Sequence, residues 1–198
     1  DDIGLTFGST LRSILRQDPD VLLIGEIRDG ETADIAVKFS LTGHLVFSTV
    51  HANDAPGTLT RLLDIGIAPF LVGSCLNLVM AQRLVRKLCD KCKEEYDPTS
   101  EELSLIGLQK KDVKTKLLKA KGCTDCRNTG YRGRTAIFEM IPMARELRKL
   151  VFNSANEDEI RQAAIKNGMV TLRDAGNERV LDGTTSIEEV LRSTVEDL

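Results

Sequence analysis

Residues 21–29, Val21-Leu22-Leu23-Ile24-Gly25-Glu26-Ile27-Arg28-Asp29, place a short apolar run directly before a polar loop. A continuous run of this kind is typical of a strand buried on both faces of a parallel sheet. The segment 31–41 has a helical pattern and stops at Gly43, and 45–50 is a second apolar run. This order predicts a strand–helix–strand unit with parallel strands, and hence an α/β fold.

Polar side chains follow both predicted strands. Glu26 and Arg28 come after the first, and His51 opens the run 51–54 after the second. Because the carboxyl ends of neighbouring parallel strands open on one crevice, we expect these side chains to converge. A carboxylate that polarises water, beside cations that neutralise charge, suits phosphate chemistry. The alternative for Glu26 and Arg28 is that they cap the strand and solvate a rim, and for His51 alone it is a surface or hydrogen-bonded core histidine.

Helices are predicted on both sides of this unit. Residues 7–15 repeat apolar positions at helical spacing, and Thr6 can cap that helix. Arg12 and Arg16 project together from it, which would equally fit an exposed helix face. The remaining expected elements are helices from 55 through 63 and from 69 to about 82, strands at 83–88, 117–118 and 134–140, one or two short helices within 93–121, and helices at 143–152, 156–166, 171–182 and 186–194.

Two Cys-x-x-Cys pairs stand out in the second half of the sequence. Cys89 and Cys92 form the first pair, and Cys123 and Cys126 the second. Four thiolates are what a closed tetrahedral Zn²⁺ site requires, so we expect a structural zinc site in a small inserted subdomain. The alternative is a set of buried free thiols. Cys75 lies in an apolar stretch and is expected to be a core residue.

The composition favours a soluble globular protein. Hydrophobic residues make up 41% and charged residues 29% of 198 residues, and no apolar run approaches the roughly 20 residues that span a bilayer. The first residues are acidic, so no signal peptide is expected, and the cysteines fit a reducing compartment that favours metal over disulfides. A formal net charge of −3 gives no overall attraction to nucleic acid.

Basic residues nevertheless gather around the cysteine pairs. A solvated face is one explanation, and docking to an acidic partner or to an anionic membrane leaflet is the other. Nucleic acid is not expected as a partner, because only Tyr96 and Tyr131 offer stacking. The residues concerned are Arg83, Arg86, Lys87, Lys91, Lys93, Lys110, Lys111, Lys114, Lys116, Lys119, Lys121, Arg127, Arg132 and Arg134.

Several long motifs resemble those of the bacterial secretion ATPases. These are the type II secretion and type IV pilus-assembly motors, a class of hexameric P-loop ATPases. Residues 25–29 resemble the Walker B segment of the family, and 42–54 resemble its histidine box. The four cysteines, 138–142 and 186–192 fit the same pattern, so the resemblance covers nearly the whole chain.

This resemblance implies roles for particular residues. Glu26 matches the catalytic glutamate, which orients or deprotonates the attacking water. His44 and His51 match the histidine box, which senses the γ-phosphate, and Arg12, Arg16 and Arg28 match arginines that reach a nucleotide across a subunit boundary. The implied cofactors are ATP and Mg²⁺ beside the expected Zn²⁺. The implied assembly is a homo-hexamer, cytoplasmic and peripheral to the inner membrane, that contacts an inner-membrane platform protein.

The sequence departs from the family pattern in two ways. Gly25 stands where Walker B segments usually carry an aspartate, so Mg²⁺ would be held by Glu26 through water or by groups elsewhere. No G-x-x-x-x-G-K-[ST] motif occurs in the 198 residues. We therefore expect a fragment whose phosphate-binding loop lies upstream, and which hydrolyses little or no ATP alone.

Three parts are expected along the chain. Residues 1–82 would form the C-terminal half of a RecA-like ATPase domain, 83–134 a tetracysteine zinc-binding subdomain, and 135–198 a helical C-terminal part. Two other readings remain open. The chain could be a non-catalytic, zinc-stabilised interaction module, or a zinc ribbon that binds nucleic acid.

Overall fold

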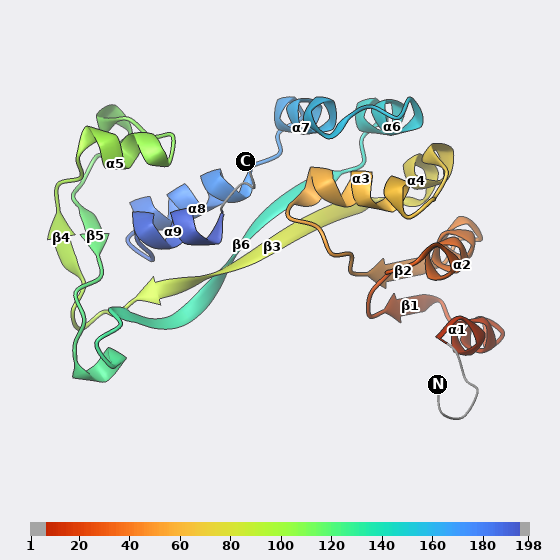
Figure 1. Cartoon of the computed structure of the whole chain (residues 1–198), viewed down its shortest axis with the longest axis horizontal. Helices are drawn as coiled ribbons and strands as arrows, with labels where there is room; N and C mark the ends of the chain where they lie inside the picture. Colours follow the sequence, from red (N-terminus) through yellow and green to blue (C-terminus); the bar gives the residue numbers. More distant parts are fainter. Residues whose placement is uncertain (1–6, 195–198) are drawn as a thin grey trace. The chain divides into compact units, whose positions relative to one another are not determined.

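The computed structural model describes residues 7–194 and divides into two compact units (Figure 1). Unit 1 contains the residues up to Val79 together with Ile141–Met169. Unit 2 contains Met80–Met140 and the residues from Val170 onward. The three-part division expected from the sequence stays a prediction.

Unit 1 contains the strand–helix–strand segment. Strand β1 (Val21–Ile24) pairs in parallel with β2 (Leu45–Ser48), with Val21 opposite Leu45 and Ile24 opposite Ser48. Helix α2 (Gly30–Leu41) connects them, and its N-terminus is capped by the Asp29 carboxylate, which accepts a hydrogen bond from the Thr32 N–H. The parallel pairing predicted from the sequence is therefore present.

Strand β1 is buried on one face only and β2 has no fully buried residue, so the expectation of burial on both faces is wrong. Leu22 and Ile24 are buried, whereas Leu23 is 75% exposed and Phe47 53% exposed. Helix α2 packs against β2, but within residues 7–194 no further strand pairs with either one. The two apolar runs are strands, as predicted. Within the described residues, however, part of the apolar surface that such strands ordinarily bury is exposed.

The other helices of unit 1 pack in pairs. They are α1 (Phe7–Leu15), α3 (Ala55–Asp64), α4 (Pro69–Cys75), α6 (Arg145–Phe152) and α7 (Glu157–Lys166). Helix α6 packs on α4 and α7 packs on α3. The Arg148 guanidinium donates to the Gly73 and Met143 carbonyls, which fixes the end of α4 against α6. The expected cap of α1, Thr6, lies outside the described residues.

Unit 2 contains two pairs of strands. Strand β3 (Leu78–Leu88) pairs with β6 (Tyr131–Pro142), and their arrows run in opposite directions in Figure 1. Two terminal residues of each of these strands belong to unit 1. Strand β4 (Glu94–Tyr96) pairs antiparallel with β5 (Leu117–Lys119). Helices α5 (Ser100–Leu105), α8 (Leu172–Leu181) and α9 (Ile187–Ser193) complete the unit, with single 3₁₀ turns at Lys110–Asp112 and Thr124–Cys126.

One predicted helix is wrong over part of its length. The helix expected from 69 to about 82 ends at Cys75, and β3 begins at Leu78. Leu76 already has an extended backbone, with φ −78° and ψ 134°. The pairing with β6 therefore decides the conformation of 78–82, because a long-range partner overrides a local helical pattern. The four helices predicted after 143 are all present, with ends shifted by at most two residues.

A buried carboxylate joins the elements of unit 2. Glu189 on α9 is 0% exposed and accepts hydrogen bonds from the Arg86 backbone N–H at 2.9 Å and the Arg86 Nε at 2.8 Å. Arg192 adds a further bond from its own Nε at 2.9 Å. The Arg86 guanidinium also lies 4.0 Å from the centre of the Tyr131 ring on β6. Glu189 therefore fixes α9 to β3, beside β6.

Candidate functional site

Glu26 and His51 meet at the carboxyl ends of β1 and β2. The Glu26 Oε2 lies 2.9 Å from the His51 Nε2. Two bonds hold the loops that present them: the Ile27 N–H donates to the Thr49 carbonyl at 2.9 Å, and the Thr49 hydroxyl donates to the Gly25 carbonyl at 2.6 Å. The side chains of Glu26 and His51 thus converge, as expected from the parallel pairing of β1 and β2.

Arg28 contacts the same carboxylate and changes its acidity. The Arg28 guanidinium forms an ion pair with the Glu26 Oε1. The hydrogen bond from Arg28 is the main reason that the pKa of Glu26 is lowered. Partial burial raises this pKa, and the hydrogen bond from His51 lowers it further. Glu26 is therefore ionised at neutral pH. Its side chain is 32% exposed and that of His51 82% exposed, so both reach solvent and can meet a ligand.

His44 lies apart from this cluster. It precedes β2, whereas Glu26 and His51 follow the carboxyl ends of the strands. Its ring stacks on Phe39 with centroids 4.0 Å apart, and its Nδ1 lies 2.9 Å from the Thr42 hydroxyl. Its Nε2 lies 3.5 Å from an Asp18 carboxylate oxygen. In the described residues His44 thus packs as a partly buried side chain at the opposite end of the strand.

Arg12 on α1 and Arg16, which follows the end of that helix, are exposed and are not part of the Glu26 cluster. Arg12 forms an ion pair with Glu31 on α2 at 2.9 Å, and Arg16 is exposed to solvent. Exposed ion pairs contribute little to stability, so Arg12 can exchange its partner at low cost. The structure therefore leaves both guanidinium groups accessible to a ligand.

The loop that begins at His51 contacts α7, and no sequence motif indicated this contact. Asp54 caps α3 by accepting the Gly57 N–H at 2.8 Å, and it forms an ion pair with Arg161 of α7 at 2.7 Å. A cavity of about 240 Å³ opens beside this contact; its lining includes His51, Asn53, Asp54, Thr60, Arg61 and Glu157. Arg161 could not be predicted as part of this site, because no motif contains it and its partner lies far away in the chain.

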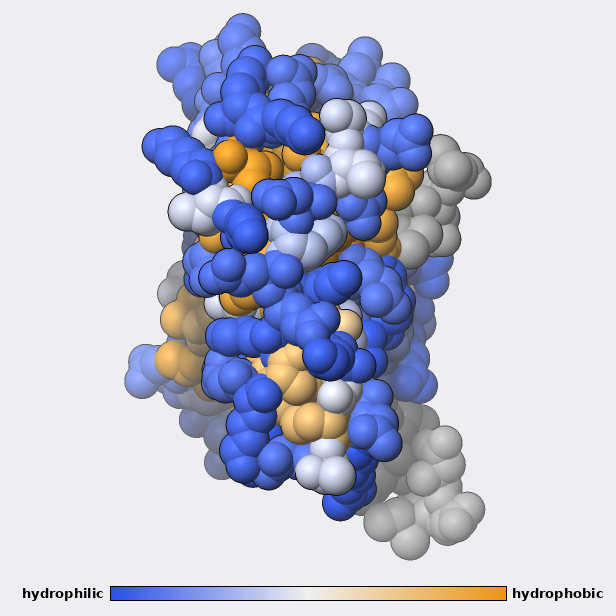
Figure 2. Space-filling model, turned by 90° about the vertical axis from the view of Figure 1, so that its left-hand side faces the viewer, coloured by the Kyte–Doolittle hydropathy of each residue, from blue (hydrophilic) through white to orange (hydrophobic). Residues whose placement is uncertain are grey.

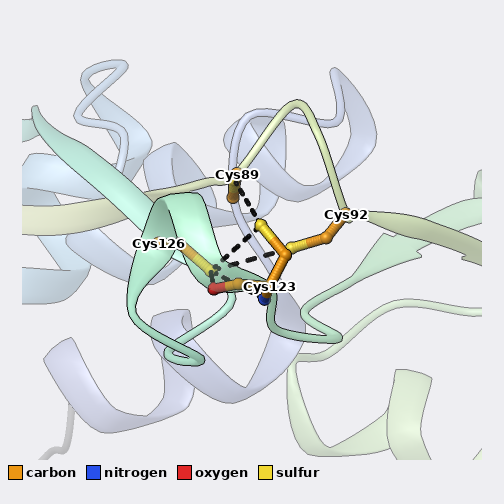
Figure 3. A group of neighbouring side chains, drawn as sticks. All are labelled: Cys89, Cys92, Cys123 and Cys126. Atoms are coloured by element: carbon orange, nitrogen blue, oxygen red, sulfur yellow. Dashed lines mark hydrogen bonds between the residues drawn. The ribbon is translucent and has the colours of Figure 1, made fainter.

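The four cysteines of the two Cys-x-x-Cys pairs form one cluster in unit 2 (Figure 3). All four Sγ atoms lie within 4.8 Å of one another. The Cys89–Cys123 sulfurs are 4.0 Å apart, Cys92–Cys126 3.8 Å and Cys123–Cys126 3.7 Å. Tetrahedral Zn²⁺ with bonds of about 2.3 Å separates its sulfurs by about 3.8 Å, so the cluster has the size of a zinc site.

Backbone donors around the second pair also fit a metal site. The N–H groups of Cys123 and Gly130 both donate to the Cys126 Sγ at 3.2 Å. Gly130 has φ +75°, and a Cβ there would lie 2.5 Å from that of Ala120, so only glycine fits. Such N–H donors to sulfur stabilise thiolate ligands and fix their orientation.

These donors also control thiol acidity. Burial raises the pKa of Cys126, but the backbone N–H groups of Cys123 and Gly130 outweigh it and lower that pKa to about 6. Burial and the neighbouring thiols raise the pKa of Cys92 to about 12. The surroundings thus shift the pKa values of Cys92 and Cys126 in opposite directions, whereas a bound divalent cation would favour the thiolate form of each ligand.

Acidic neighbours neutralise part of the basic region around the cysteines. Lys91 pairs with Asp125 at 2.7 Å, and Lys93 with Asp90 at 2.7 Å. Figure 2 faces the side of Figure 1 that carries β4, β5 and α5, and shows a mostly hydrophilic surface with separate hydrophobic patches. Among the described helices, none combines the length and the apolar character that a membrane crossing requires.

Comparison with known proteins gives consistent matches. A sequence model of the family described as "Type II/IV secretion system protein" matches residues 1–192. The chain is 51% identical to the type IV pilus assembly ATPase PilB of Myxococcus xanthus, over 100% of the chain and 35% of the relative. It is 50% identical to the type II secretion system protein E of Pseudomonas aeruginosa, over 98% of the chain and 38% of the relative.

Solved structures share the fold at lower sequence identity. The pilus retraction motor PilT with bound ADP is similar at a TM-score of 0.65 and 22% identity, over 97% of this chain and 44% of that one. The ATPase DotB of Yersinia pseudotuberculosis is similar at a TM-score of 0.66 and 21% identity, over 96% and 40%. The chain thus spans between about a third and a half of the lengths of the proteins that it matches.

Proposed function

This chain belongs to the family of type II/IV secretion system proteins, and we propose that it supplies the catalytic glutamate and a structural zinc site of a secretion or pilus-assembly ATPase. The contact that carries the proposal is the one between Glu26 and His51, at the carboxyl ends of two parallel strands. Ligands of open α/β sheets bind at this edge.

In the proposed reaction Glu26 positions the water that attacks the γ-phosphate of ATP. An ionised carboxylate can orient that water and accept its proton, and the lowered pKa of Glu26 keeps it in this form at neutral pH. His51 orients the carboxylate from the neighbouring loop. Bound Mg²⁺ would neutralise phosphate charge; Glu26 is the oxygen donor at this edge suited to hold it, through water, since Gly25 has no side chain.

The arginines are proposed to act between subunits of a homo-hexamer. Arg12 is exposed on α1, Arg16 is exposed just after that helix, and Arg28 is exposed beside Glu26. A guanidinium supplied by a neighbouring subunit would stabilise the charge of the transferring phosphoryl group and couple hydrolysis to the ring. His44 would influence the site through β2, since it contacts Phe39 and Thr42 at the other end of that strand.

The four cysteines are proposed to hold a structural Zn²⁺. Their mutual distances and the N–H donors to Cys126 support this assignment. All four ligands come from protein, which leaves no open position for a substrate. The zinc site would fix the two cysteine turns together and so hold the β4–β5 pair that lies between them in sequence.

The cellular setting follows as part of the same proposal. The whole protein would act in the cytoplasm beside the inner membrane, where domain movement driven by ATP hydrolysis is passed to a platform protein of the secretion or pilus machine. The exposed basic residues between 110 and 116 offer a surface for an acidic partner of this kind.

The test is a Glu26→Gln substitution in the full-length protein, with ATP turnover and ATP binding measured separately. We expect turnover to fall by at least about a hundredfold while the Kd for ATP changes little, because the substitution removes the charge but keeps the shape. Asp34→Asn, an exposed change on α2, is the matched control and should leave both quantities unchanged. Unchanged turnover in Glu26→Gln would refute the proposed role.

A further inference from the structure

We propose that Arg161 of α7 is a positioning residue for the His51 loop, and so for the catalytic carboxylate; this inference rests on the proposed function. Arg161 would act through Asp54, which ends the loop that begins at His51.

The contact between Arg161 and Asp54 is more enclosed than an ordinary surface ion pair. Their atoms lie 2.7 Å apart, and the two side chains are only 22% and 17% exposed. Arg161 also donates to Glu157, one turn earlier on α7, at 2.6 Å. One guanidinium thus bridges a carboxylate of its own helix and a carboxylate of the loop, in a setting where solvent screens the charges less than at an open surface.

Asp54 also accepts a hydrogen bond from the first turn of α3, which restrains the loop further. Its Oδ1 accepts the Gly57 N–H at 2.8 Å and caps α3, while its Oδ2 pairs with Arg161. The two oxygens are therefore committed to two directions, which fixes the side chain and the backbone that carries it. Gly57 permits this approach, because a Cβ there would lie 3.0 Å from Asp54 Oδ1 and 3.4 Å from Glu157 Oε2.

The other end of the loop, at His51, is exposed, whereas Asp54 is largely enclosed. His51 is 82% exposed, and its contact with Glu26 is the one that would orient the carboxylate. A solvent-exposed imidazole holds such a geometry only if its backbone is fixed from elsewhere. The Asp54–Arg161 pair supplies that restraint three residues further along the chain. His51 and Asp54, the two ends of this loop, line one cavity together with Glu157.

The experiment measures ATP turnover of the full-length protein at saturating and limiting ATP. We expect Arg161→Gln to lower kcat by about tenfold while KM stays within about twofold, because a misplaced catalytic group slows the chemical step without weakening nucleotide binding. Asp54→Asn keeps an oxygen that caps α3 but removes the charge, so it should lower kcat by a similar factor. The double variant should fall no further, and Arg161→Lys should recover part of the loss.

Two controls separate positioning from general stability. Arg145→Gln removes an exposed arginine from α6 and should leave kcat unchanged. In a His51→Gln background, Arg161→Gln should have no further effect on kcat, since the group it positions is gone. A purely structural role would instead lower kcat by the same factor in both backgrounds, and that result overturns the inference.

The outcomes also distinguish this inference from the function on which it rests. Loss of turnover in Glu26→Gln with unchanged kcat in both Arg161→Gln and Asp54→Asn rejects the positioning role alone. Unchanged turnover in Glu26→Gln rejects the assigned catalytic carboxylate, and the positioning role with it. If Arg161→Gln fails to fold, the kcat of Asp54→Asn decides the question.

Discussion

Two glutamates, one in each unit, meet arginines in contrasting ways. Glu26 in unit 1 reaches solvent, and its partners Arg28 and His51 are more exposed than it is. Glu189 in unit 2 is fully buried and receives bonds from two arginines and a backbone N–H. The cysteine cluster is closer to the second case, since Cys89 and Cys126 are buried and backbone N–H groups donate to the Cys126 sulfur. An exposed carboxylate with exchangeable partners suits chemistry, whereas an enclosed one stabilises the fold.

The largest loss of stability is expected when a cysteine of the cluster is replaced. Cys123→Ser removes one of four ligands, and structural zinc contributes on the order of 10 kcal/mol in small metal-dependent domains. We expect loss of bound zinc, measured by elemental analysis, and loss of hydrogen-exchange protection across 89–130. Cys75→Ser, at a cysteine outside the cluster, is the control and should keep one zinc per chain. Equal zinc content in Cys123→Ser and the parent would contradict the assignment.

Loss of the buried carboxylate should come next. Glu189→Ala leaves the Arg86 backbone N–H without its acceptor and removes the shared partner of Arg86 and Arg192, whose side chains are 37% and 58% exposed; we expect a cost of about 3 kcal/mol. Urea unfolding monitored by circular dichroism measures the change. The adjacent Glu188 is exposed, so Glu188→Ala should stay within about 0.5 kcal/mol of the parent. Similar costs at the two positions would remove the contrast between buried and exposed acids.

Acid should weaken unit 2 through the same residue. Burial raises the pKa of Glu189, but the bonds from Arg192 and Arg86 outweigh it and lower the pKa to about 2. Because the pKa is lower in the folded state, the stabilisation is complete above about pH 4.5 and is lost as the pH falls toward 2. The loss should reach up to about 3 kcal/mol. Glu189→Gln should lack this part of the pH dependence in unfolding experiments between pH 2 and 5.

The smallest effect on stability is expected at Glu26. Its ion pair with Arg28 and its contact with His51 are exposed, so Glu26→Gln should leave the urea midpoint of the chain unchanged within error. The same substitution is expected to abolish ATP turnover in the full-length protein. A marked loss of stability would show that Glu26 is part of the fold in the manner of Glu189.

The sequence allowed prediction of features that depend on local pattern. The apolar runs at 21–24 and 45–48 are parallel strands, as predicted, because each run precedes a polar loop and a helix lies between them. The meeting of Glu26 and His51 follows from that pairing, since carboxyl ends of parallel strands share an edge. The cysteine spacing likewise predicted four sulfurs in one place. Their chemical roles stay predictions.

Features that depend on distant partners could not be predicted. Leu78–Gln82 has a pattern compatible with a helix and becomes a strand only because β6 pairs with it. Arg161 and Glu189 find their partners across long stretches of chain, and no spacing rule marks them. His44 and His51 belong to one sequence motif, yet they lie at opposite ends of β2. His44 precedes the extended strand and His51 follows it, so the length of the strand separates them.

The apolar side of the β1–β2 pair has a practical consequence for work with this polypeptide. Val21, Leu23, Leu45 and Phe47 all present large side chains to water in the described residues. Such a surface on a short two-stranded sheet favours self-association in solution, which would lower solubility and bury the neighbouring loop that carries Glu26 in aggregates. Biochemical assays on this stretch alone therefore need light-scattering checks, and a lysine in place of Leu23 should improve its behaviour during purification.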